Sequence, residues 1–228
     1  MKFLKDILHL FFPKVCMCCS KHLGNNENTI CLICRHDLPL TLFSSHEKNL
    51  VEQTFYGRIP LQNGTALFYF LKKGKVQQLI HNLKYNNQQQ IGYFIGNWLG
   101  EEIIASNRFK NLDCIIPVPL HRKKIKKRGY NQVTTFGERL SKKLNIPFYE
   151  SILTRISSTK TQTKNIRIDR WKNVQELFFV RNNSILENKH ILLIDDVITT
   201  GATLEACYKA LNKAKNLKIS IACMAYTK

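Results

Sequence analysis

An apolar run that ends in two adjacent acids and a small-residue loop constrains this chain more than any other feature. Four consecutive aliphatic residues, 191–194, are typical of a strand that is buried on both faces, as in a parallel sheet. Asp195 and Asp196 follow, and the next residues predict a helix by the spacing of Leu204, Cys207, Tyr208 and Leu211. In open α/β sheets, ligands bind at the carboxyl ends of strands. The sequence therefore predicts an α/β fold with a ligand site here.

The loop between this strand and this helix has the composition of a phosphate cradle, and it comprises Thr199, Thr200, Gly201, Ala202 and Thr203. A helix start offers unpaired N–H groups, the glycine allows close backbone approach, and the threonine hydroxyls can donate hydrogen bonds. Asp195 and Asp196 repel a phosphate but accept hydrogen bonds from sugar hydroxyls beside it. Together these groups predict a site for ribose 5-phosphate. The alternative, a plain strand, turn and capped helix, gives no reason for two carboxylates at the end of a sheet.

Two acids followed by T-T-G-x-T resemble the phosphoribosyl pyrophosphate (PRPP) motif of type I phosphoribosyltransferases. The resemblance implies that Asp195 and Asp196 hold the ribose hydroxyls and that 199–203 hold the 5-phosphate. The run lacks the glycine patterns of P-loops and dinucleotide-binding folds.

Two C-x-x-C knuckles lie near the amino terminus. Their spacing predicts a structural Zn²⁺ site with four thiolate ligands, Cys16, Cys19, Cys31 and Cys34. Cys18 could replace a neighbour, and His22 or His36 is a weaker substitute. Free thiols or disulfides are the alternative to a metal.

The balance of charge favours a polyanionic partner. Thirty-five Lys and Arg against 16 Asp and Glu leave a net charge of +19, and the alternative is a generally basic, solvated surface. The first twelve residues are too short and too charged to span a membrane, and no signal-peptide cleavage pattern follows them. We therefore expect a cytoplasmic protein without a membrane span.

Residues 122–128 hold six cations in seven positions, directly after a predicted strand at 112–118. So dense a run favours a nearby anion, and pyrophosphate and a nucleic-acid backbone are both candidates. The alternative is a solvated basic loop before the helix predicted from 133 to 144. In phosphoribosyltransferases the loop after the first core strand binds pyrophosphate, so the resemblance assigns this role to Pro119, His121, Arg122, Lys123 and Arg128.

The remaining elements complete an α/β pattern. Strands are predicted at 65–71, 177–180 and 217–226, helices at 76–83 and 91–103, and a connector without periodic signals at 40–62. Lys84 and Tyr85, at the end of the first helix, could reach a binding cleft. The polar stretch from 155 to 178 has the length of a functional flap, with Thr161, Gln162 and Arg170 as ligand-contacting candidates, or it is disordered.

The whole chain resembles the ComF family, phosphoribosyltransferase-like proteins linked to bacterial competence and the use of external DNA. The resemblance rests on cysteine knuckles after F-P, on P-V-P-L-H-R leading to R-G-Y-N-Q, and on T-x-T-Q and R-W-x-N-V before the PRPP motif. It implies a zinc ribbon at 1–45, a connector at 46–63 and a parallel-sheet type I phosphoribosyltransferase-like domain at 64–228. Two positions depart from the family pattern. Cys18 makes the choice of metal ligands ambiguous, and Glu176-Leu177 makes the alignment of the flap less certain.

The implied chemistry is displacement of pyrophosphate from C1 of PRPP by a nitrogen nucleophile, with Mg²⁺ bridging pyrophosphate and ribose oxygens. Three hypotheses follow. The first is phosphoribosyl transfer to an unidentified acceptor. The second is a PRPP-binding protein that holds incoming single-stranded DNA, with other competence or DNA-uptake proteins as partners. The third, glutamine-dependent amidophosphoribosyl transfer, requires a terminal nucleophilic Cys, which the start Met1-Lys2 disfavours.

Overall fold

A computed structural model describes residues 13–155 and 177–228. The order of elements in these residues is α2 (Leu32–His36), η1 (Phe43–Ser45), α3 (Leu50–Phe55), β1 (Gly64–Phe70), α4 (Lys75–Tyr85), α5 (Gln90–Ser106), β2 (Cys114–Pro117), α6 (Arg122–Arg128), α7 (Thr134–Leu144), β3 (Leu153–Arg155), β4 (Phe178–Val180), η3 (Ser184–Leu186), β5 (His190–Ile198), α8 (Ala202–Leu211) and β6 (Lys218–Thr227).

The central sheet has four strands in the order β1-β6-β5-β2, and all neighbouring strands pair in parallel. Parallel neighbours need crossover connections, which the helices supply. β5 and β6 occupy the centre and are almost entirely buried as far as Ile194 and Ala225. This explains why their sequences are nearly continuous apolar runs. The parallel-sheet phosphoribosyltransferase type I fold predicted from the sequence is confirmed.

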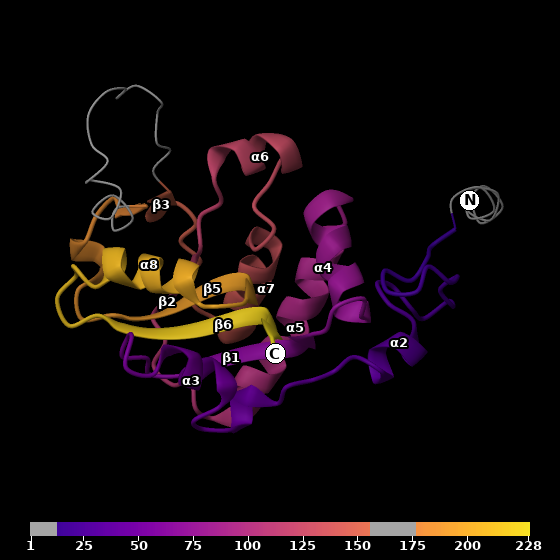
Figure 1. The fold of residues 1–228 in the computed structure, drawn as a ribbon, viewed down its shortest axis with the longest axis horizontal. Helices are drawn as coiled ribbons and strands as arrows, with labels where there is room; N and C mark the ends of the chain where they lie inside the picture. The colour runs from indigo at the N-terminus through magenta and orange to yellow at the C-terminus, as the bar shows by residue number, and fades with distance from the viewer. Residues whose placement is uncertain (1–12, 156–176) are drawn as a thin grey trace.

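Both faces of the sheet are covered. Leu192 and Ile194 of β5 pack in a cluster with α4, α5 and α7, whereas Ile191 and Leu193 pack on the other face with α3 and α8. Successive residues of a strand point to opposite faces, so one run of aliphatic residues contributes to both clusters. A separate antiparallel pair joins β3 with β4, which precede and follow 156–176 in the sequence. Figure 1 shows β3 above α8.

The cysteine-containing segment docks on the helical layer. Cys16, Ile30, Cys34 and Leu38 belong to the same apolar cluster as α4 and α5. The amide of Asn82 in α4 also donates to the carbonyl of Met17 at 2.9 Å. Figure 1 shows this segment, with α2, on the far side of α4 from β5.

Two expectations about local structure were wrong. The stretch expected to be an aperiodic connector contains η1 and α3, and α3 buries Val51 and Phe55 in the core. The basic run expected to be a loop, 122–128, is the helix α6, which projects from the molecule between β3 and α4 (Figure 1). The His121 side chain caps this helix at its start, and Gly129 ends it in the left-handed conformation.

The strand at 191–194 is also longer than expected. Its pairing with β6 continues through Asp195 to Ile198, so the two acids lie within the strand and not after it. The flap candidates Thr161, Gln162 and Arg170 lie outside the described residues. Within 13–155 and 177–228, no helix is long and apolar enough to cross a membrane.

Candidate functional site

The acid pair lies near the carboxyl end of the central strand β5. Asp195 and Asp196 point to opposite faces because they are neighbours in a strand. Asp196 is 7% exposed, whereas Asp195 is partly exposed. A buried carboxylate requires hydrogen-bonding or charged partners, and Asp196 has both.

Two side chains converge on one oxygen of Asp196. Lys84, in the last turn of α4, places its Nζ 2.8 Å from Oδ2 of Asp196. Gln132, just before α7, donates from Nε2 to the same oxygen at 2.5 Å. Three segments that are distant in sequence therefore meet at the acid. Lys84 thus reaches the acid pair, and its place in a binding cleft stays a prediction.

Arg128, the last residue of α6, extends this network. Its guanidinium donates to Oε1 of Gln132 at 2.7 Å and to the hydroxyl of Tyr85 at 3.3 Å. The same guanidinium lies 5.0 Å from the centroid of the Tyr85 ring, a cation–π contact. Arg128 thus orients Gln132, which in turn orients Asp196.

Burial and the adjacent charge of Asp196 raise the pKa of Asp195 to about 8. The N–H of Asp196, which donates to Oδ1 of Asp195 at 2.8 Å, and the charges of Lys84 and Lys124 act in the opposite direction. Even with these opposing contributions, the pKa of about 8 leaves Asp195 largely protonated near neutral pH in the protein without a ligand.

The predicted phosphate loop begins directly after β5 and ends in α8. Gly201 has φ +74°, and a Cβ there would lie 2.7 Å from Cε1 of Phe55 in α3. Only glycine combines this left-handed backbone with this close approach. The other loop residues, Thr199, Thr200, Ala202 and Thr203, are exposed, and the N–H of Ala202 donates to Oγ1 of Thr200 at 3.4 Å.

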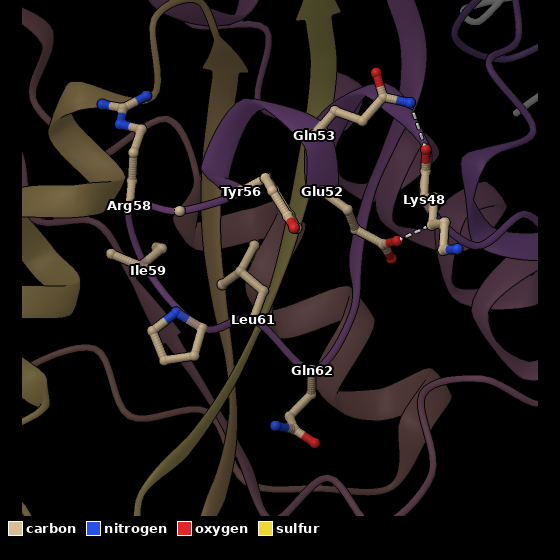
Figure 2. Close-up of a pocket in the computed structure, with 10 residues that line it drawn as sticks. Lys48, Glu52, Gln53, Tyr56, Arg58, Ile59, Leu61 and Gln62 are labelled. Carbon is tan, nitrogen blue, oxygen red and sulfur yellow. Dashed lines mark hydrogen bonds between the residues drawn. The ribbon is translucent and has the colours of Figure 1, made fainter.

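Arg58, which sequence reasoning missed, anchors this loop. It donates to the carbonyl of Thr200 at 2.8 Å and pairs with Glu205 of α8 at 2.5 Å. Figure 2 shows Arg58 at the border of a cavity of about 680 Å³ beside α3, with its guanidinium directed towards α8. The backbone N–H of Lys48 donates to Glu52 there, and the side chain of Gln53 donates to the carbonyl of Lys48. The remaining lining, which includes Ile59, Pro60 and Leu61, is mostly apolar.

The predicted pyrophosphate residues lie at the neighbouring strand end. The N–H of Val118 donates to the carbonyl of Ile194 at 2.9 Å, which brings the loop after β2 beside the acids. Nδ1 of His121 accepts from the N–H of Lys123 at 3.1 Å, so this histidine serves as a helix cap. Arg122 and Lys123 are exposed, and Pro119 is partly buried.

Four of the amino-terminal cysteines form a compact cluster. The sulfur atoms of Cys16, Cys19, Cys31 and Cys34 all lie within 4.8 Å of one another, and those of Cys19 and Cys31 are 3.9 Å apart. Zn–S bonds of about 2.3 Å in a tetrahedron place sulfur atoms about 3.8 Å apart. The donor set and its spacing therefore fit a small zinc ribbon.

Position, and not thiol pKa, separates the four ligand candidates from Cys18, because burial and neighbouring thiols also raise the pKa of Cys34 above its usual value. Burial raises the pKa of the Cys16 thiol, but the N–H groups of Cys31, Cys18 and Cys19 outweigh burial and lower that pKa to about 6. The Cys18 thiol lies outside the cluster, and burial together with the charge of Cys16 raises its pKa to about 12. Cys18 is therefore not one of the four grouped thiols.

Comparison with known proteins agrees with this geometry. Residues 132–228 match the model of the phosphoribosyl transferase domain. Competence protein F of Haemophilus influenzae is 34% identical over 139 residues, 59% of this chain and 61% of that protein. DNA utilization protein YhgH of Escherichia coli K12 is 28% identical over 152 residues, 65% of this chain and 66% of that protein. The chain thus spans somewhat less than two thirds of each relative.

A solved structure, the glutamine PRPP amidotransferase from B. subtilis complexed with ADP and GMP, aligns with a TM-score of 0.44 and 13% identity. The alignment covers 63% of this chain and 30% of that one. The residues matched by the domain model include the acid pair and the loop 199–203, and the two relatives are named for competence and for DNA utilization. These findings support the resemblance to the ComF family of phosphoribosyltransferase-like proteins.

Proposed function

We propose that this protein binds PRPP at the carboxyl end of β5 and transfers its ribose 5-phosphate to an acceptor. One observation carries the proposal. The acid pair Asp195–Asp196 and the loop 199–203 are separated by only two residues and open at the start of the ten-residue helix α8. Sugar-binding carboxylates and a phosphate cradle are thus presented together.

The chemical roles follow from charge. Asp195 and Asp196 accept hydrogen bonds from the ribose hydroxyls and favour the positive charge that develops on the ribose as pyrophosphate leaves. Pro119, His121, Arg122, Lys123 and Arg128, at the neighbouring strand end, line the path of the pyrophosphate. Mg²⁺ enters with PRPP, because this ion keeps near-ideal oxygen coordination and binds phosphate substrates through few protein groups.

The test is calorimetric titration of PRPP with Mg²⁺, joined to an assay for released pyrophosphate. Asp196→Asn is expected to weaken PRPP binding at least about tenfold, because hydrogen bonds to a charged acceptor are lost. The matched control is Asp113→Asn, since Asp113 pairs with Lys189 at 2.9 Å before β2, at the other end of the sheet. Equal PRPP affinity in both variants would contradict the assignment.

A second candidate function is binding of single-stranded DNA, with a role in DNA uptake. The relatives are named for competence and for DNA utilization. α6 carries six cations in seven residues, buries none of them, and projects into solvent. A cationic helix of this kind suits a phosphate backbone.

Salt dependence separates this candidate from transfer. Replacing Lys123, Lys126 and Lys127 with Gln removes three charges without touching Arg128 or the helix cap. If α6 binds DNA, the slope of log affinity against log salt becomes shallower by about two to three. An unchanged slope would place the DNA contact elsewhere. Pyrophosphate release with any base tested would support transfer over binding alone.

We also propose that the four grouped cysteines bind structural Zn²⁺ in a ribbon at 1–45 and that 64–228 forms the transferase-like domain. The stretch between them, 46–63, contributes Val51 and Phe55 of α3 to the core of that domain. The geometry of the thiols supports the metal, and thiolate ligation is natural in a reducing cytoplasm. Four thiolates leave no open position, so the metal has a structural role.

A further inference from the structure

Lys84 forms the most buried ion pair at the site, and its helix is firmly anchored. Its ammonium lies 2.8 Å from Oδ2 of Asp196, and the two side chains are only 20% and 10% exposed. The preceding residue, Leu83, is fully buried, and the hydroxyl of Tyr130 donates to its carbonyl. The end of α4 is therefore fixed relative to the acid pair.

Arg128, a second cation connected to Asp196 through Gln132, is committed elsewhere. Arg128 bonds to Gln132 and Tyr85, and the ion pair recorded for Asp196 in the described residues comes from Lys84. Lys84 and Gln132 both bind Oδ2, and none of the hydrogen bonds found in the described residues involves Oδ1 of Asp196. Oδ1 is left for a ligand.

We propose that Lys84 is a positioning residue of the phosphoribosyl site, which keeps Asp196 ionised and fixes the oxygen that it offers to the ribose. The inference rests on the proposed PRPP site. A buried carboxylate that loses its counter-ion takes up a proton or loses its orientation. A protonated Asp196 would no longer offer two acceptor oxygens to the sugar.

The surroundings of the acids make Lys84 decisive. The titratable groups that face the pair are Lys84 of α4, Lys124 of α6, and the thiols of Cys207 and Cys223. Burial raises the pKa of both thiols well above its usual value, so they stay neutral and cannot compensate a lost cation. Lys124 belongs to the exposed helix α6, where water screens its charge.

The experiment compares PRPP affinity across a pH range of about 7 to 9.5 for wild type, Lys84→Gln, Lys84→Arg and Lys143→Gln. Lys143 is a matched control because its Nζ also lies 2.8 Å from a carboxylate, that of Glu101, on the surface between α7 and α5. We expect Lys84→Gln to weaken binding about ten- to hundredfold near pH 7.5. The pH at which its affinity is half maximal should rise by about one unit or more.

Lys84→Arg keeps the charge and is expected to recover most of the affinity, and Lys143→Gln is expected to match wild type. The inference would be overturned if Lys84→Gln lost the same PRPP affinity at every pH and Lys84→Arg bound as weakly as Lys84→Gln. That result would indicate a packing role, which does not depend on pH. Binding by Lys84→Gln within about twofold of the control would also overturn it.

Failure of the proposed function is a distinct result. If wild type binds no PRPP, that function is wrong, and ¹³C NMR titration of the Asp196 carboxyl group then tests Lys84 directly. A higher pKa of Asp196 in Lys84→Gln supports the inference, and an unchanged pKa overturns it. If Lys84→Gln does not fold, the test uses Lys84→Arg. A pH profile of PRPP affinity, or an NMR titration curve, that matches wild type supports the charge role of Lys84. A profile or curve shifted along the pH axis contradicts it.

Discussion

Substitution of Gly201 by alanine tests whether the phosphate loop is built by a close approach to α3. Gly201 has φ +74°, and a Cβ there would meet Cε1 and Cζ of Phe55 at 2.7 and 2.8 Å. Phe55 is fully buried and cannot move away freely. The left-handed backbone costs about 1–2 kcal/mol for alanine, and overpacking adds about 1–3 kcal/mol.

The free energy of unfolding of Gly201→Ala should therefore fall by about 2–5 kcal/mol. For a chain of this size that corresponds to a loss of roughly 5–15 °C in melting temperature. Chemical denaturation measures the free energy, and PRPP titration of the folded variant should show affinity at least about tenfold weaker, because displaced N–H groups no longer converge on the phosphate.

Gly129→Ala is the matched control. Gly129 has φ +83°, but a Cβ there meets nothing within 4 Å, so this variant bears only the backbone cost of about 1–2 kcal/mol. Phe55→Leu in the Gly201→Ala background removes the clashing ring edge, and a double-mutant cycle should show a favourable coupling of about 1 kcal/mol or more. Equal destabilisation by the two alanine substitutions, or no coupling to Phe55, would refute the reasoning.

If the four grouped thiols hold Zn²⁺ as proposed, chelation should lower the melting temperature of wild type. Cys34→Ser should lose zinc, measured by metal analysis, whereas Cys18→Ser should retain it; equal zinc content in both would contradict the four-thiolate centre. The pKa of Asp195 is raised to about 8 in the folded protein, so the folded state holds a proton that the unfolded chain releases near pH 4. Stability should therefore fall as pH rises from about 4 to 8, and Asp195→Asn should gain stability relative to wild type between pH 5 and pH 8 in denaturant titrations. A constant difference between the two proteins at both pH values would argue against a raised pKa of Asp195.

Local patterns in the chain were sufficient for much of the fold. The four aliphatic residues from Ile191 to Ile194 predicted the central strand because burial on both faces of a parallel sheet requires an unbroken apolar run. The periodic helices at 76–83 and 91–103 appeared as α4 and α5 for a similar reason. The charge pattern gave the wrong secondary structure at 122–128, where six neighbouring cations suggested a loop. The structure has a helix there, because His121 and Gly129 cap its two ends and its charges face water.

Taken alone, the sequence determined which groups follow the central strand and which thiols share a knuckle, because both are set by short-range order along the chain. The ligand and the metal proposed for these groups rest on that order. The tertiary structure decided how these groups are held. Lys84 and Gln132 meet Asp196, Arg58 meets Thr200, and Cys18 is left outside the thiol cluster. The contacts of Asp196 and Thr200 join residues that are far apart in the chain. Cys18 differs from its neighbours Cys16 and Cys19 only in the direction of its side chain. Strand register and helix docking fix these positions, and no local pattern in the sequence encodes either.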